Sequence, residues 1–170
     1  MTDTRFEAAL LKTLKFEGGV SANPMDPGGL TKWGVTQLSY TRWRVSLNLP
    51  ARSVLDMTED ETHALYFRDY WLAAGCDKLP ESLGFPVFDM AVNSGPDVAV
   101  KTLQKVLGVT VDGEVGPETI AAANGAKNVL LQFLKQRGLF YRDIIKGKPD
   151  QVVFLGGWIS RLLEQAWGQA

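Results

Sequence analysis

A single long irregular segment, residues 18–36, interrupts a sequence whose pattern is otherwise helical. It holds four glycines and two prolines before Gly34, and such residues break a regular helix. On both sides of it, apolar residues recur at spacings of three and four, as they do along one face of a helix. We therefore expect an all-α fold, with β-structure limited to a small hairpin within 18–36. A loop of this length inside a domain is usually functional.

Capping and stop signals predict where the helices begin and end. Thr4 with Glu7, and Thr58 with Glu61, have the spacing of capping boxes, and Gly18 and Gly147 mark helix ends. We expect helices over residues 4–17, 36–48, 58–71, 85–93, 97–107, 117–124 and 130–147, and a last one from about 150.

The chain length bounds the domain organisation. A chain of 170 residues, 45% hydrophobic and 22% charged, can bury one core without disulfides or metals. No internal repeat and no Pro/Ser-rich linker divides it. We expect a single compact helical domain over residues 1–170.

Composition excludes several classes of function. The net charge is −1, and the one local group of basic residues (Arg42, Arg44 and Arg52) is interpreted as a solvated face, so a nucleic-acid partner is not expected. One cysteine and one histidine allow no disulfide and no zinc ligand set. We expect no metal and no cofactor, with Cys76 as a buried filler. Serine or cysteine nucleophile chemistry would need His63 as its base, and no Gly-x-Ser-x-Gly motif supports it.

The N-terminal residues have no apolar signal-peptide core, and the chain has no transmembrane run. The expectation is synthesis in the cytoplasm without a signal peptide, and no stable membrane insertion.

Glu17 continues the apolar face of the first expected helix. That face carries Phe6, Ala9, Leu10, Thr13 and Leu14. A carboxyl group in a partly desolvated place is harder to ionise, and once protonated it can donate to a glycosidic oxygen. Position alone leaves a second interpretation open, a helix-end glutamate that reaches solvent.

The loop after Glu17 holds two further groups that glycoside hydrolysis can use. Asp26 is a second carboxylate, stiffened by Pro24 and Pro27, and Thr31 supplies a hydroxyl that could hold a water. The alternatives are a turn residue for Asp26 and a backbone-bonding hydroxyl for Thr31.

Residues 16–19 (Phe-Glu-Gly-Gly) and 26–36 (Asp-Pro-Gly-Gly-Leu-Thr-Lys-Trp-Gly-Val-Thr) resemble the active-site signature of glycoside hydrolase family 108. This family comprises lysozyme-like N-acetylmuramidases, found as phage endolysins and secretion-associated muramidases. The resemblance implies that Glu17 is the catalytic acid, with Asp26 and Thr31 as its partners. The Asp-to-Thr spacing is one shorter than in phage-type lysozymes, so Thr36 is an alternative. Val20 stands where the family often has an aromatic residue.

The resemblance extends through most of the chain. Residues 66–71 and 88–95 match family helices, 103–119 resemble the signature of peptidoglycan-binding modules, and 154–161 resemble the closing helix. It implies a catalytic half, 1–84, and a helical half, 85–170, that resembles a peptidoglycan-binding region. The 103–119 motif fits equally a separate wall-binding site or a shared helical scaffold.

The implied reaction is hydrolysis of the β-1,4 bond between N-acetylmuramic acid and N-acetylglucosamine in peptidoglycan strands. Because sugar faces stack on rings, Trp33 and Tyr70 are candidates to line the groove, and Asn93 is a candidate to bind sugar hydroxyls. For Asp89, capping of the turn at 95–96 is favoured over sugar binding. Action in the periplasm or cell wall would need a holin or another export partner.

Two other functions stay open at this point. One is a non-catalytic peptidoglycan-binding or export-accessory protein on a lysozyme-like scaffold. The other is a lytic transglycosylase that uses the same Glu17 and yields an anhydro sugar.

Overall fold

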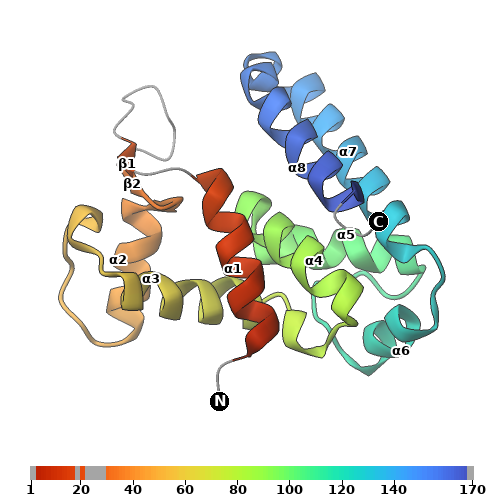
Figure 1. Ribbon diagram of the computed structural model, residues 1–170, viewed down its shortest axis with the longest axis horizontal. Coiled ribbons are helices and arrows are strands. Elements are labelled where there is room, and N and C mark those ends of the chain that lie inside the picture. The colour runs from red at the N-terminus through yellow and green to blue at the C-terminus, as the bar shows by residue number, and fades with distance from the viewer. Residues whose placement is uncertain (1–2, 18–19, 22–29, 168–170) are drawn as a thin grey trace. The chain divides into compact units, whose positions relative to one another are not determined.

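The computed structural model describes residues 3–17, 20–21 and 30–167. The chain divides into two compact units, Met1–Tyr70 and Trp71–Ala170, and each is described by itself (Figure 1). The single domain over 1–170 with halves meeting at residue 84 stays a prediction.

The first unit combines helices with one small antiparallel sheet. Its elements are α1 (Thr4–Glu17), β1 (Val20–Ser21), β2 (Thr31–Lys32), β3 (Val35–Thr36), α2 (Gln37–Ser46), η1 (Val54–Asp56), α3 (Glu59–Tyr66) and the π-helix η2 (Phe67–Leu72), which runs into the second unit. The strand order is β1-β2-β3. Thr31 pairs with Ser21 on one side and with Thr36 on the other. The predicted all-α fold, with β-structure confined to the 18–36 segment, is confirmed.

Helix α1 buries the face that the periodicity predicts, since Phe6, Ala9, Leu10 and Thr13 are all buried. Its capping differs from the prediction. Asp3 accepts a 3.0 Å hydrogen bond from the Arg5 N–H, and Thr4 is already the first helical residue. The predicted Thr4–Glu7 capping box is wrong, because an aspartate one position earlier is an equally good N-cap.

Helices α2 and α3 begin at threonine caps. Thr36 accepts from the Ser39 N–H, and Thr58 forms the full capping box with Glu61 that the sequence predicts.

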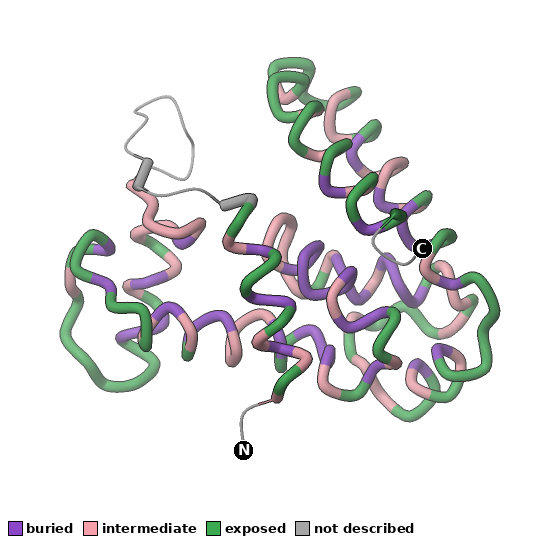
Figure 2. Tube along the Cα trace, viewed as in Figure 1, coloured by how far each residue is buried: buried purple, intermediate pink, exposed green. Residues whose placement is uncertain are grey.

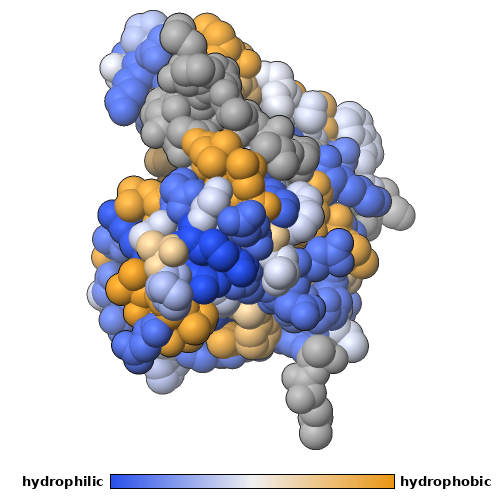
Figure 3. All heavy atoms as spheres, turned by 90° about the vertical axis from the view of Figure 1, so that its left-hand side faces the viewer, coloured by the Kyte–Doolittle hydropathy of each residue, from blue (hydrophilic) through white to orange (hydrophobic). Residues whose placement is uncertain are grey.

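Several large apolar side chains of the first unit are exposed, among them Leu38, Val45, Leu47, Leu49 and Leu55. On the face shown in Figure 3, separate apolar patches alternate with polar and charged side chains. Scattered exposure of this kind needs no partner to explain it.

Among the described residues of the second unit, helices are the only regular elements. Its elements are η3 (Cys76–Lys78), α4 (Glu81–Ser94), α5 (Pro96–Leu107), α6 (Pro117–Gly125), α7 (Val129–Gly147), η4 (Pro149–Phe154) and α8 (Leu155–Trp167). Helices α7 and α8 lie side by side as a hairpin (Figure 1). None of the described helices of either unit is both long and apolar enough to span a membrane.

Helix α4 supplies the core of the second unit, where buried positions are concentrated (Figure 2). It begins at Glu81, four residues before the predicted start, and contains Pro86. Leu83 and Val87 are fully buried on either side of that proline, so packing outweighs its low helix propensity. Cys76 is buried, as predicted.

Candidate active site

The turn between β2 and β3 holds Trp33 in an unfavourable backbone conformation. Trp33 has φ 49° and Gly34 has φ 77°. Two consecutive positive φ values match a type I′ hairpin turn, which favours Asn, Asp or Gly at the first position. A tryptophan there is strained, and such strain persists only where surrounding contacts hold it.

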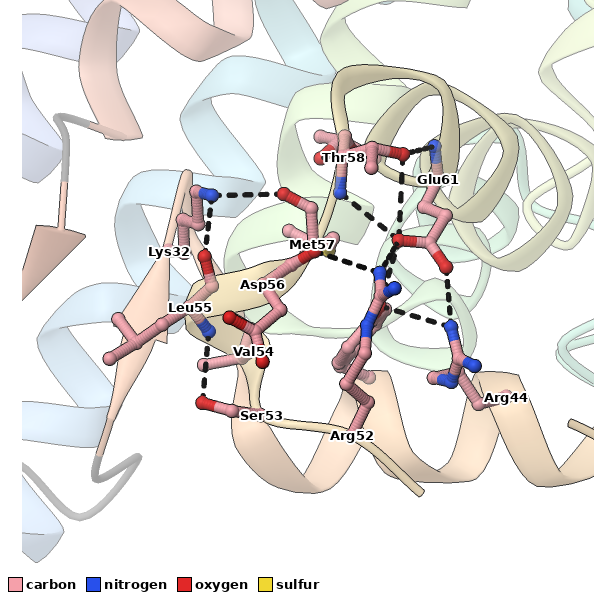
Figure 4. Close-up of polar contacts among 12 residues, drawn as sticks. Lys32, Arg44, Arg52, Ser53, Val54, Leu55, Asp56, Met57, Thr58 and Glu61 are labelled. Atoms are coloured by element: carbon pink, nitrogen blue, oxygen red, sulfur yellow. Dashed lines mark hydrogen bonds and ion pairs between the residues drawn. The ribbon is translucent and has the colours of Figure 1, made fainter. Parts of the chain in front are cut away.

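Two side chains fix this turn. The Lys32 ammonium donates to the carbonyls of Leu55 (2.7 Å) and Met57 (2.9 Å), as Figure 4 shows, and lies 4.4 Å from the centroid of the Trp33 ring. The hydroxyl of buried Tyr66 donates to the Trp33 carbonyl at 2.8 Å. The sheet, η1 and α3 therefore hold the position of the tryptophan together.

Trp33 forms part of the wall of a pocket of about 340 Å³ in the first unit. The wall comprises Leu10, Leu14, Trp33, Glu59, Asp60, Thr62 and His63. Apolar groups from α1 and the hairpin turn meet polar groups from the first turns of α3. A mainly apolar concavity with a few polar groups is the usual form of a ligand site, and it contains the predicted sugar-stacking residue Trp33.

His63 has a carboxylate partner on α1. Its Nε2 lies 2.7 Å from Oε1 of Glu7, and the Phe6 ring packs edge-on against the imidazole with centroids 5.0 Å apart. Glu7, predicted as a capping residue, pairs with His63 instead. Among the described residues, no three His, Cys, Asp or Glu side chains form a group that could hold a metal ion.

Glu17 is the last residue of α1, three positions after the pocket residue Leu14. Helical spacing places it on the same face of the helix. The side chain of Glu17 and the whole of Asp26 lie outside the described residues, so their catalytic roles stay predictions.

Thr31 and Thr36 are cross-strand partners in the β2–β3 pair. The Thr36 hydroxyl accepts from the Ser39 N–H and donates to the Ser39 hydroxyl, both at 3.1 Å. Thr36 therefore caps α2, and the predicted role of holding a water stays with Thr31. That role stays a prediction.

Tyr70 belongs to the same aromatic group as the strained turn. Its ring lies 5.3 Å from that of Tyr66, whose hydroxyl bonds to Trp33. The structure thus joins the predicted groove residues Trp33 and Tyr70 through Tyr66. Tyr66 is not among the predicted site residues, although its spacing of four from Tyr70 indicates that the two lie on one helix face.

A charged cluster around Glu61 braces α2 against α3 (Figure 4). Glu61 pairs with Arg52, and its Oε1 lies 2.5 Å from Nη1 of Arg44. Tyr40 donates to Glu61 Oε2 at 2.8 Å. The predicted solvated arginine face is wrong for Arg44, which is buried, and for Arg52, because both neutralise a partly buried carboxylate.

These contacts perturb ionisation within the cluster. Burial alone would raise the pKa of Glu61, but hydrogen bonds from Thr58 and Tyr40 and the charges of Arg52 and Arg44 outweigh it and lower that pKa. The hydrogen bond with Tyr40, followed by nearby charges, raises the pKa of Arg52 above its ordinary value.

In the second unit, Asp89 lies in a buried ionic network. Its side chain is fully buried and pairs with Arg137 (2.7 Å) and Arg161 (2.9 Å). Gln165 donates to it at 2.8 Å. The predicted capping of the 95–96 turn is wrong, because the carboxylate compensates two guanidinium groups from α7 and α8.

Asn93 lies at one end of that network. Its Oδ1 accepts from the hydroxyls of Tyr141 (2.9 Å) and Ser94 (3.1 Å), and Arg137 donates to the Tyr141 oxygen at 2.6 Å. Burial, opposed by the Arg137 charge, raises the pKa of Tyr141. Sugar binding by Asn93 stays a prediction.

The comparisons with known proteins agree with this architecture. Residues 10–95 match the family described as Glycosyl hydrolase 108, and residues 98–163 match one described as Predicted Peptidoglycan domain. The chain belongs to the glycosyl hydrolase 108 family, so the resemblance found in the sequence is confirmed. It is a lysozyme-like protein that acts on peptidoglycan.

Among solved structures, the chain is similar to one titled "Structure of Brucella abortus SagA". The identity is 30%, the alignment covers 96% of this chain and 92% of that chain, and the TM-score is 0.84. The search of curated protein sequences found no match.

Proposed function

We propose that the protein is an N-acetylmuramidase that hydrolyses the β-1,4 bond between N-acetylmuramic acid and N-acetylglucosamine, with Glu17 as general acid. One observation carries this proposal. Leu10 and Leu14 of α1 line a pocket together with the strained Trp33, and α1 ends at Glu17 on the same helical face. The helix that contributes Leu10 and Leu14 to the pocket wall thus ends at a glutamate, and the same wall holds a ring suited to stacking on a sugar.

The proposed reaction divides the work among three residues. Glu17 protonates the glycosidic oxygen as the bond to the leaving sugar breaks. Asp26 stabilises the positive charge that develops on the other sugar, or activates the water, and Thr31 positions that water. Attack of the water on the anomeric carbon completes hydrolysis. The proton that the water loses is taken up by a carboxylate.

The proposal is tested by measuring reducing ends released from purified cell walls. Glu17→Gln should lower the rate by about two to four orders of magnitude, because a general acid contributes roughly that much. Glu118→Gln, an exposed carboxylate in the first turn of α6, is the control and should match wild type. If wild type binds walls but releases no fragments, with either reducing or 1,6-anhydro ends, a non-catalytic role replaces the proposal. Unchanged activity in Glu17→Gln would overturn the acid assignment alone.

The product distinguishes hydrolysis from transglycosylation. A muramidase releases fragments with a reducing muramic acid end, whereas a lytic transglycosylase releases 1,6-anhydro ends, which are lighter by one water. We expect the hydrolytic product, because the proposed site includes Thr31 to position a water for the attack. Mass spectrometry of the fragments decides between them.

We further propose that the protein acts on peptidoglycan strands in the periplasm or the cell wall. A holin or another export partner would bring it there. Lysis from outside by added protein, compared with lysis on expression with and without a co-expressed holin, tests this step.

A further inference from the structure

The second unit contains its own pocket, of about 590 Å³, built from other residues than the first pocket. Its wall comprises Leu72, Ala73, Gly75, Lys78, Gly113, Glu114, Val115, Gly116, Pro117 and Ile120. The pocket therefore lies between the turn before η3 and the segment that leads into α6. This segment is the second half of the 103–119 motif.

A buried glutamine fixes one wall of this pocket. Gln104 is 1% exposed, and its amide nitrogen donates to Asp112 (2.7 Å) and to the Glu114 carbonyl (2.9 Å). Its amide oxygen accepts from the Gly113 N–H at 2.9 Å, and Asp112 accepts from the Glu114 N–H at 2.8 Å. The turn is thus held by bonds from a core side chain, so its shape is set before any ligand binds.

The backbone of the opposite wall, at Gly75, lies very close to the side chain of Val115. Gly75 has φ 61°, and a Cβ added there would lie 2.5 Å from Cβ of Val115. Only glycine fits both the conformation and the contact. The two walls therefore meet at Gly75 and Val115, which close one side of the pocket.

Two oppositely charged side chains form part of the pocket wall. Lys78 and Glu114 are both exposed, and neither forms an ion pair within the part of the chain that the structure describes. Apolar side chains, Leu72, Val115 and Ile120, lie between the same walls. Among the described residues that form the wall, none has an aromatic ring to stack on a sugar.

We propose that this pocket binds the zwitterionic amino-acid end of the short stem peptides that peptidoglycan carries. Lys78 pairs with the peptide carboxylate, Glu114 pairs with an ammonium group, and the aliphatic part of the peptide packs on the apolar side chains. The inference rests on the proposed function for its substrate, peptidoglycan, but assigns the peptide to the second unit and the glycan to the first. The 103–119 motif is then both a scaffold and a binding site.

The first test measures binding of a soluble stem peptide with a free diamino-acid end to the whole protein, by calorimetry and amide chemical-shift changes. Lys78→Ala and Glu114→Gln should each weaken binding about two- to fivefold, as expected for exposed ion pairs. Lys105→Ala, which removes an exposed lysine outside the pocket, should change nothing. Chitin oligomers should not compete. Absence of peptide binding, or equal binding by all four proteins, overturns the proposal.

A second variant blocks the pocket without touching its charges. A Cβ added at Gly116 meets no atom within 4 Å, and its backbone (φ −90°, ψ −177°) suits any residue. Gly116→Leu should fill the pocket and weaken peptide binding more than about tenfold, as loss of several contacts does. Gly125→Leu is the matched control, since a Cβ there is equally unobstructed and lies outside the pocket. Equal peptide binding by the two folded variants would exclude this pocket.

Failure of this inference and failure of the proposed function give different results. Glu17→Gln should bind the stem peptide as well as wild type does. Lys78→Ala and Gly116→Leu should still hydrolyse glycan strands from which the peptides have been removed, while losing affinity for intact walls. If the protein binds the stem peptide but neither wild type nor any variant releases reducing ends, only the muramidase proposal fails.

Discussion

The hydroxyl of Tyr66 lies 2.8 Å from the backbone carbonyl oxygen of Trp33, and this bond joins the end of α3 to the strained turn of the sheet. Tyr66 itself is fully buried, so its hydroxyl has a fixed place from which to donate. A residue held at positive φ needs such a restraint. The position of Trp33 in the pocket wall therefore depends on Tyr66, a side chain that is not part of that wall.

Tyr66→Phe removes this bond and leaves the Trp33 carbonyl without its donor. We expect the free energy of unfolding to fall by about 1–2 kcal/mol, and wall lysis to fall further as the turn relaxes. Chemical denaturation and turbidity assays measure the two effects. Ser46→Ala, which removes an exposed hydroxyl bonded to a helix carbonyl, is the control. Wild-type stability and lysis in Tyr66→Phe would show that the bond does not hold the turn.

Trp33→Asn separates stacking from folding. Asparagine suits the first position of a type I′ turn, so relief of backbone strain should offset the lost ring contacts and keep stability within about 1 kcal/mol of wild type. Wall hydrolysis should fall at least tenfold, because loss of a large apolar contact costs roughly 1.5–3 kcal/mol. If lysis is unchanged while the variant is folded, Trp33 is a turn residue only.

Local patterns predict the parts of this molecule that local interactions decide. The apolar spacing along α1 predicts its buried face, and the spacing of Thr58 and Glu61 predicts a capping box that the structure contains. The Gly- and Pro-rich segment predicts where β-structure interrupts the helices. Each of these features depends on residues within a few positions of one another.

Pairings between distant residues are what the sequence cannot supply. Asp89 meets Arg161 from a position 72 residues away, and nothing in the spacing of either residue marks the other. The pairing of Arg44 with Glu61 is likewise not marked by their spacing. The sequence therefore predicts a solvated group of arginines, whereas two of them, Arg44 and Arg52, neutralise the Glu61 carboxylate. The sequence likewise contains no sign that the 103–119 motif lines a pocket, because Gly75 and Lys78 form the other wall.

Glu61→Gln should make the first unit less stable in a pH-dependent way. Because the folded state lowers the pKa of Glu61, its charge stabilises the fold above the unfolded pKa of about 4.5, and this contribution is lost as the pH falls through the lower folded pKa. At pH 7 we expect a loss of about 2 kcal/mol. Below pH 4.5 the gap to wild type should narrow. Thermal unfolding between pH 3 and 7 measures it.

The control for Glu61→Gln is Glu59→Gln, an exposed carboxylate in the same helical turn. Its effect should stay below about 0.5 kcal/mol. A constant difference between Glu61→Gln and wild type across this pH range would contradict the assigned cause.

Asp89→Asn tests the buried network of the second unit. The carboxylate is fully buried between two guanidinium groups, so its neutralisation leaves buried cations uncompensated and should cost about 3–5 kcal/mol. Asp97→Asn, which disrupts an exposed pair with Lys101, should cost less than about 1 kcal/mol. Adding Arg161→Met to Asp89→Asn removes one unpaired cation and should recover part of the loss, giving a coupling energy of about 1 kcal/mol or more. Denaturation of Asp89→Asn, Arg161→Met, their double variant and Asp97→Asn decides the matter: if the losses of the two single variants Asp89→Asn and Arg161→Met simply add in the double variant, the pair with Arg161 does not carry the stability assigned to it.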